Sequence, residues 1–199
     1  MAEPDLSLIA QITPSPSGWL AAVTGQFDEF LKDHASCEKK ASGMAMAVAS
    51  HYPDQPRLLR AMVDLAVEEL NHYREVVRLL LARNIVPGPD SKDSYINALN
   101  SHVRRGPANF LLDRLLMGAV VERRGAERFA LVADCLSDED PELARFYRSI
   151  AASEHRHWEL FYKLAWHHCP QAEVAERFNE LVEIEAEVML SQPFRPALH

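Results

Sequence analysis

The sequence predicts an all-α protein, and three observations support this prediction: the placement of the prolines, the helical spacing of apolar residues, and the absence of strand patterns. Twelve prolines in 199 residues leave long proline-free stretches, and a helix interior excludes proline at a cost of about 3 kcal/mol. No run of alternating β-branched residues bounded by hairpin turns is present. We therefore expect a bundle of helices.

Five proline-free stretches are each long enough for one helix or a broken pair of helices. In the first stretch, Asp33 can cap a fresh helix after a break near Lys32. The segment 85–107 is predicted to be a long crossover with one short helix around 95–103, as in four-helix bundles in which two neighbouring helices run parallel. The last stretch predicts an additional C-terminal helix. The stretches are 17–52, 57–86, 108–140, 142–169 and 171–192.

Apolar residues recur every three or four positions in these stretches, as on the buried face of an amphipathic helix. The second stretch carries Leu58, Met62, Leu65, Tyr73, Val76 and Leu80, and the fourth carries Leu143, Tyr147, Ile150, Phe161 and Leu164. We expect these residues to form one core. No linker or change of composition marks a second domain, so residues 1–199 are predicted to form a single domain.

Composition and charge exclude several classes of protein. With 48% hydrophobic and 25% charged residues, no apolar run approaches the ~18 residues of a membrane span. The net charge of −8 argues against a DNA-coating protein, so any nucleic acid must be bound by a local basic patch. Three distant cysteines without a Cys-x-x-Cys pair exclude a disulfide framework. No secretory signal is visible, so we expect a cytoplasmic protein.

Six polar residues interrupt the apolar stripes at positions that would point into the core. Four of them form two Glu-x-x-His motifs, a spacing that places a carboxylate and an imidazole on one helix face, able to share one metal ion. Each motif is preceded on the previous predicted helix by a lone glutamate. The six residues are Glu38, Glu69, His72, Glu122, Glu154 and His157.

The repeated arrangement is more informative than either motif alone, because this composition gives roughly one Glu-x-x-His match by chance. The order Glu, Glu-x-x-His, Glu, Glu-x-x-His matches the ligand set of di-iron and di-manganese carboxylate bundles. Four carboxylates also balance the charge of two divalent ions. An oxygen-rich set with two imidazoles suits iron or manganese better than zinc.

Four sequence blocks, in which these six residues lie, resemble the bacterial tRNA 2-methylthio-isopentenyladenosine hydroxylase family. The blocks are DHASCEKKAS (33–42), VEELNHYREV (67–76), NALNSHVRRGPANFLLDRLLMGAVVERRGAERF (97–129) and ASEHRHWELF (152–161). The resemblance extends from about Trp19 to the predicted helix that ends near His168. These blocks are far more specific than a bare Glu-x-x-His motif.

The resemblance implies a ferritin-like four-helix bundle and a non-haem di-iron monooxygenase. Such an enzyme hydroxylates the isopentenyl group of the modified adenosine next to the anticodon of tRNA. It uses two iron ions, dioxygen as co-substrate, and two electrons from a reductase or a ferredoxin. Carried over by position, the iron ligands would be Glu38, Glu69, His72, Glu122, Glu154 and His157.

A tRNA substrate requires a basic patch in spite of the overall negative charge. Anticodon loops present splayed bases, which proteins bind without covering much duplex, so a small patch suffices. Each candidate residue could instead be an ordinary solvated charge on a helix. The candidates are Lys39, Lys40, Arg104, Arg105, Arg123 and Arg124.

Two other interpretations remain open from the sequence. The first is an iron-oxidising or peroxide-detoxifying protein of the ferritin or rubrerythrin type, although the cysteine-rich module that rubrerythrins commonly carry is absent. The second is a metal-free helical interaction protein. In that case, replacing Glu69 or Glu154 with leucine would be neutral or stabilising, whereas ligands would lose iron binding.

Overall fold

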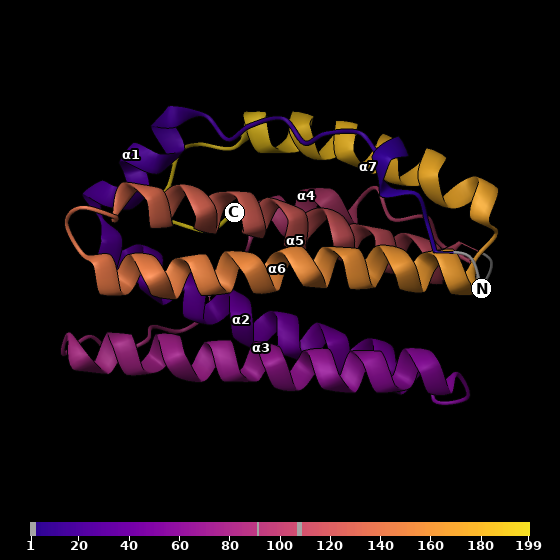
Figure 1. Ribbon diagram of the computed structural model, residues 1–199, viewed down its shortest axis with the longest axis horizontal. Coiled ribbons are helices and arrows are strands. Elements are labelled where there is room, and N and C mark those ends of the chain that lie inside the picture. Colours follow the sequence, from indigo (N-terminus) through magenta and orange to yellow (C-terminus); the bar gives the residue numbers. More distant parts are fainter. Residues whose placement is uncertain (1–2, 91, 107–108) are drawn as a thin grey trace. The chain divides into compact units, whose positions relative to one another are not determined.

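The computed structural model describes residues 3–90, 92–106 and 109–199, and every regular element in these ranges is a helix (Figure 1). The all-α prediction is confirmed. The chain divides into two compact units, which we name after their central helix pairs. The α2–α3 unit contains the described residues of 18–91 and 194–198, and the α5–α6 unit contains those of 1–17, 92–193 and His199.

Three helices build the α2–α3 unit: α1 (Ser17–Gly25), α2 (Phe27–His51) and α3 (Pro56–Ala82). Helices α2 and α3 lie side by side (Figure 1). Near their midpoints the Ser42 hydroxyl donates a hydrogen bond of 2.8 Å to the Ala66 carbonyl. The predicted apolar stripe of α3 faces inward, and its buried residues are Leu58, Met62, Leu65, Val76 and Leu80.

The expected helix break near Lys32 is wrong, because α2 runs through this position and the break falls at Gln26. Gln26 has φ −143°, and it follows Gly25, a poor helix former. Asp33 does not cap a helix. Its carboxylate accepts a hydrogen bond of 2.7 Å from the Leu198 backbone N–H, which fixes the segment 194–198 to this unit.

Helix α3 ends at Ala82, before the end of its proline-free stretch, because the chain forms a Schellman turn there. Asn84 adopts a positive φ of 59°, which asparagine tolerates better than most residues. The Ile85 N–H then donates to the Leu80 carbonyl at 2.9 Å, and the Asn84 N–H donates to the Leu81 carbonyl at 3.0 Å. These two bonds satisfy carbonyls that the helix end would leave exposed.

The α5–α6 unit contains a short 3-10 helix and four α-helices. Helices α5 and α6 lie side by side, α7 packs against both, and α4 packs against α7 (Figure 1). The crossover helix is shorter than predicted, and Pro107 and Ala108, at the border of the third stretch, lie outside the described residues. The elements are η1 (Leu6–Leu8), α4 (Ser94–Asn100), α5 (Phe110–Cys135), α6 (Pro141–His168) and α7 (Gln171–Ser191).

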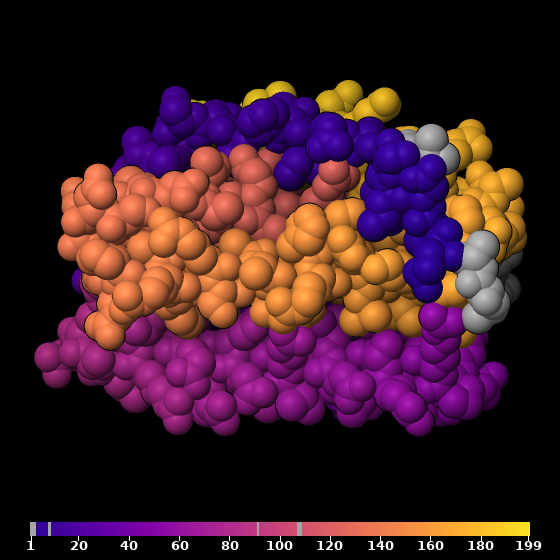
Figure 2. Space-filling model, in the orientation of Figure 1, coloured from indigo at the N-terminus to yellow at the C-terminus, as the bar shows by residue number. Residues whose placement is uncertain are grey.

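The N-terminal segment is fixed to the surface of this same unit, where Figure 2 shows it in indigo. The Ala10 N–H donates to Asn179 Oδ1 on α7, and the Ser15 N–H donates to Glu127 Oε1 on α5, both at 2.8 Å. Arg123 of α5 donates in return to the Ala10 carbonyl at 2.7 Å. The segment therefore connects two helices through its backbone.

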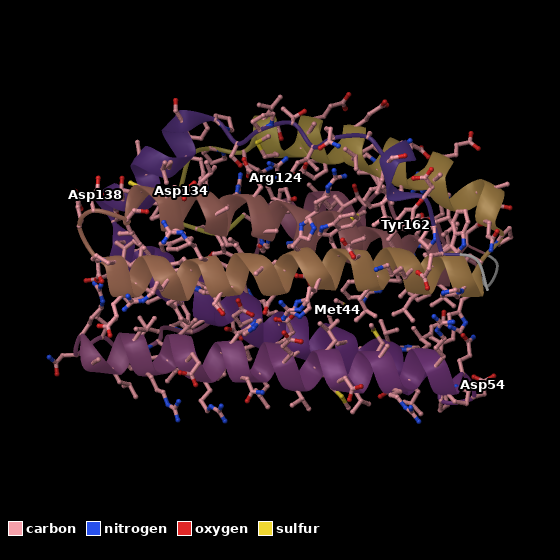
Figure 3. All side chains as sticks on the ribbon, in the orientation of Figure 1. Met44, Asp54, Arg124, Asp134, Asp138 and Tyr162 are labelled. Atoms are coloured by element: carbon pink, nitrogen blue, oxygen red, sulfur yellow. The ribbon has the colours of Figure 1, made fainter. Side chains whose placement is uncertain are left out.

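A buried ion pair links α5 to α7. Arg124, which is labelled in Figure 3, donates to both carboxylate oxygens of Glu185 at 2.8 and 2.7 Å, and both side chains are fully buried. The Tyr95 hydroxyl of α4 adds a hydrogen bond of 2.9 Å to the same carboxylate. Glu185 lies on an inward-facing stripe, and this pair is its structural role.

Two features agree with the expectations from composition. Within the described ranges, no helix combines the length and the apolar character needed to cross a bilayer. Cys37, Cys135 and Cys169 are free thiols, as their odd number and wide spacing indicate.

We predict that Glu185→Leu lowers the free energy of unfolding by about 3–5 kcal/mol, because the buried Arg124 guanidinium would lose its buried counter-charge and keep only the partly exposed Glu127 carboxylate at 3.1 Å. The double variant Arg124→Met/Glu185→Leu removes both charges and should recover most of this loss. Glu183→Leu, an exposed change on the same helix, should have little effect. Chemical denaturation followed by circular dichroism measures all three. A Glu185→Leu variant as stable as the parent would contradict the prediction.

Candidate metal centre

The α2–α3 unit brings together three of the six predicted ligands. Glu38 lies on α2, Glu69 and His72 lie one turn apart on α3, and none of the three is more than 9% exposed. His72 Nδ1 lies 3.4 Å from Glu38 Oε2 and 3.5 Å from Glu69 Oε2. One ligand atom from each residue lies within 4.8 Å of the others. We call these three residues the α2–α3 half-site.

The charges of the α2–α3 half-site stabilise one another. Burial alone would raise the pKa of Glu38, but hydrogen bonds with His34 and His72 outweigh burial and hold this pKa well below its ordinary value. Burial likewise lowers the pKa of His72, but hydrogen bonds to Glu38 and Glu69 raise it to about 9. Two carboxylates thus surround one imidazolium. A metal cation bound there would replace the proton of that imidazolium.

The α5–α6 unit brings together the other three predicted ligands. Glu122 lies on α5, Glu154 and His157 lie one turn apart on α6, and all three are buried. His157 Nδ1 lies 3.6 Å from Glu154 Oε2, and one ligand atom from each residue lies within 4.8 Å of the others. The Glu154 side chain packs over Gly125, where a Cβ atom would lie 3.7 Å from its Cγ. We call these residues the α5–α6 half-site.

Each half-site offers two carboxylates and one imidazole, which is a donor set that fits a divalent iron or manganese ion. An uncompensated buried carboxylate costs several kcal/mol. One imidazolium neutralises only one of two carboxylates, so each half-site keeps a formal charge of −1 while both carboxylates are ionised. A divalent cation supplies the missing positive charge. The residues present therefore fit one metal ion for each half-site.

Sequence reasoning did not single out His34, which the structure places against the α2–α3 half-site. His34 Nε2 lies 2.7 Å from Glu38 Oε1, and the ring is fully buried. A signal for this contact is present in the sequence, because a residue four positions before a helical ligand lies on the same helix face.

The six candidates for tRNA contact fall into two groups. Lys39 and Lys40 are exposed on α2, where Lys39 Nζ pairs with Asp90 at 2.9 Å, and Arg105 is exposed in the crossover. Arg104, Arg123 and Arg124 are less exposed, and the structure shows a contact within the protein for each of their guanidinium groups. Arg104 binds Asp113 at 2.8 Å, Arg123 stacks over the Trp158 ring at 5.1 Å, and Arg124 is buried with Glu185.

The structure therefore places Arg124 in the core and not on a surface that an RNA backbone could reach. Arg123 is held between the Trp158 ring and the N-terminal segment. Lys39, Lys40 and Arg105 keep the exposure that a phosphate contact needs.

Comparison with known protein families and curated proteins identifies one family. The family model described as tRNA-(MS2IO6A)-hydroxylase (MiaE) matches residues 1–199. A tRNA 2-(methylsulfanyl)-N6-isopentenyladenosine(37) hydroxylase of Pseudomonas putida is 35% identical over 193 residues, covering 94% of this chain and 92% of the relative. An enzyme of the same name from Salmonella typhimurium is 33% identical over 159 residues, covering 80% of this chain and 57% of that protein.

A solved structure also resembles this chain along most of its length. It is "Protein 43 with aldehyde deformylating oxygenase activity from Synechococcus", with a TM-score of 0.86 and 32% sequence identity. The match covers 95% of this chain and 92% of the other. The likeness confirms the ferritin-like all-α fold class that the sequence predicts.

Proposed function

The chain belongs to the tRNA-(MS2IO6A)-hydroxylase family, MiaE, and on that premise we infer that it hydroxylates the isopentenyl group of 2-methylthio-isopentenyladenosine next to the anticodon of tRNA. The enzyme is a hydroxylase with the fold of a di-iron oxygenase. The main structural support for a metal-dependent reaction is the pair of buried half-sites, each with two carboxylates and one imidazole. Family membership favours this reaction over iron storage or peroxide reduction.

We propose that the two half-sites together hold two iron ions, with residues 1–199 acting as a single ferritin-like domain. The proposed ligands are Glu38, Glu69, His72, Glu122, Glu154 and His157. Four ionised carboxylates carry a charge of −4, and two ferrous ions carry +4, so the loaded centre is formally neutral. Neutrality favours a charged site in an apolar interior.

Iron, when bound, supplies the redox chemistry that activates dioxygen. The proposed reaction consumes one dioxygen, two electrons and two protons. One oxygen atom enters a C–H bond of the isopentenyl group and the other leaves as water. The electrons come from a reductase or a ferredoxin, and the reaction takes place in the cytoplasm.

We propose that apolar side chains beside the α5–α6 half-site help to exclude water from it. In the α5–α6 unit, Gly118 lies one turn before Glu122, and the ring of Phe161 fills the space above it, 3.0 Å from the position of a Cβ atom. The Phe129 ring lies next to Gly125 and is buried. An apolar lining of this kind protects a reactive centre from water and suits an isopentenyl substrate.

We propose that Lys39, Lys40 and Arg105 contact the tRNA backbone. The distribution of charge supports this assignment for the two lysines, because residues 18–91 and 194–198 contain nine Lys and Arg against ten Asp and Glu. The other residues contain twelve against nineteen. The polyanion therefore meets less repulsion at the α2–α3 unit.

The first test measures the reaction directly. Protein reconstituted with ferrous iron is mixed with a chemical reductant, dioxygen labelled with a heavy isotope, and tRNA that carries the unhydroxylated nucleoside. Mass spectrometry of the digested tRNA should show one labelled oxygen atom in the isopentenyl group. Iron-loaded, folded protein that incorporates no oxygen would overturn the proposed function.

The second prediction concerns the ligands. Glu154→Leu should abolish most iron binding, because one carboxylate donor is lost, yet leave the stability of the metal-free protein unchanged or higher, because a buried charge is removed. Metal analysis and thermal unfolding measure these two effects. Glu159→Leu is the control, since Glu159 lies on the same helix and pairs with Lys163; it should keep about two irons per chain. Full iron content in Glu154→Leu would exclude this residue as a ligand.

The third prediction concerns tRNA binding. The double variant Lys39→Glu/Lys40→Glu should weaken tRNA binding about tenfold or more, and reduce the dependence of log Kd on log salt by about one for each lost phosphate contact. Iron content is measured first, because both lysines follow Glu38 in the sequence. Arg145→Glu, an exposed change on α6, should bind tRNA more nearly as the parent does. Equal affinities of the parent and the double variant would reject these contacts.

A further inference from the structure

We propose that His34 is a positioning residue that fixes Glu38 in the α2–α3 half-site and thereby strengthens metal binding at that half-site. The inference rests on the proposed metal centre. It concerns a residue outside the six ligands, and it follows from the contact that His34 makes with Glu38.

The contact between His34 and Glu38 has the geometry of a strong hydrogen bond. The Nε2–Oε1 distance is 2.7 Å, and both side chains are buried. An ionised carboxylate can only accept hydrogen bonds, so Nε2 carries the proton and donates it. A donated bond to a charged acceptor in a buried place is stronger than one in water. One oxygen of Glu38 is thereby oriented, and the other lies towards His72.

His34 is itself held in place by aromatic packing. Its ring stacks on Phe30 with centroids 6.1 Å apart and an angle of 29°. Phe30 in turn meets the edge of Trp19 at 6.4 Å, and the Trp19 indole N–H donates to the Ala197 carbonyl at 2.8 Å. The imidazole therefore has a rigid support that extends to the C-terminal segment of the same unit.

The α5–α6 half-site has no histidine at the equivalent position. Glu38 and Glu122 are the two lone glutamates of the repeat, and the residue four positions earlier is His34 in one case and Gly118 in the other. A Cβ atom at Gly118 would lie 3.0 Å from the Phe161 ring, so this ring occupies the space that a side chain would need. The repeat thus places a hydrogen-bond donor beside one glutamate and an aromatic ring at the corresponding place beside the other.

A ligand that is already oriented loses less freedom when it binds metal. Loss of such a supporting contact typically lowers metal affinity by about 10–100-fold. We therefore expect the ion bound at the α2–α3 half-site to weaken when His34 can no longer donate. The ion at the α5–α6 half-site should be much less affected, because its ligands lie on other helices.

Titration with Co²⁺ tests this inference without relying on catalysis, since Co²⁺ gives visible absorption bands that report its ligands. The parent protein should bind two ions per chain. His34→Phe keeps the ring stacking on Phe30 but lacks the N–H donor. It should bind one ion as the parent does and the other about 10–100-fold more weakly, with altered bands. His34→Gln retains an N–H donor and should recover most of the lost affinity.

The control is His51→Leu, because His51 is an exposed histidine at the other end of α2 and its loss should change neither ion. If His34→Phe does not fold, the smaller His34→Leu replaces it under the same criteria. A folded variant that binds both ions with parental affinity and spectrum would overturn the role of His34, as would a His34→Gln variant no better than His34→Phe. Failure of the parent itself to bind Co²⁺ or ferrous iron would instead overturn the proposed metal centre.

Discussion

The burial of four carboxylates is the constraint on which the rest of this structure depends. Each half-site places two glutamates and one histidine inside a helix pair, where an uncompensated negative charge costs several kcal/mol. The helices can hold these residues because long apolar stripes above and below them supply the packing energy. The same stripes make the surroundings of these six residues largely apolar. Without metal, the buried carboxylates lower the stability of the protein. The same carboxylates are needed if these six residues are to bind metal.

The α5–α6 unit shows how a protein neutralises a buried acid when no metal is intended. Glu185 meets the guanidinium of Arg124, and Asp113 meets those of Arg104 and Arg177 at 2.8 and 2.7 Å. In both cases an arginine side chain of the protein supplies the positive charge. In each half-site two carboxylates share one imidazole, which offsets only one negative charge even when it is protonated, and His34 adds a hydrogen bond to Glu38. This difference in local charge supports the proposal that the acids of the half-sites are metal ligands.

Much of the fold and the site follows from the sequence. The proline-free stretches locate the long helices, and the repeated Glu-x-x-His pattern finds the six residues that the structure gathers into two half-sites; their role as iron ligands stays a prediction. Local sequence could not locate the helix break, because Asp33 looks the same whether it caps a helix or binds the distant Leu198 N–H. Arg124 is among the sequence candidates for tRNA contact, but the structure buries it with Glu185. Helix α5 packs against both α6 and α7, so it is buried on more than one side.

The two units interleave along the chain, and this has a consequence for how the protein can be made. Residues 194–198 complete the α2–α3 unit through Trp19 and Asp33, although α1 to α3 leave the ribosome long before them. The segment that contains Ala10 and Ser15 is fixed to helices α5 and α7, which are synthesised much later than this segment. Neither unit is a continuous stretch of sequence. Folding during synthesis can therefore form helices early, but both units close only after the last helix has been translated.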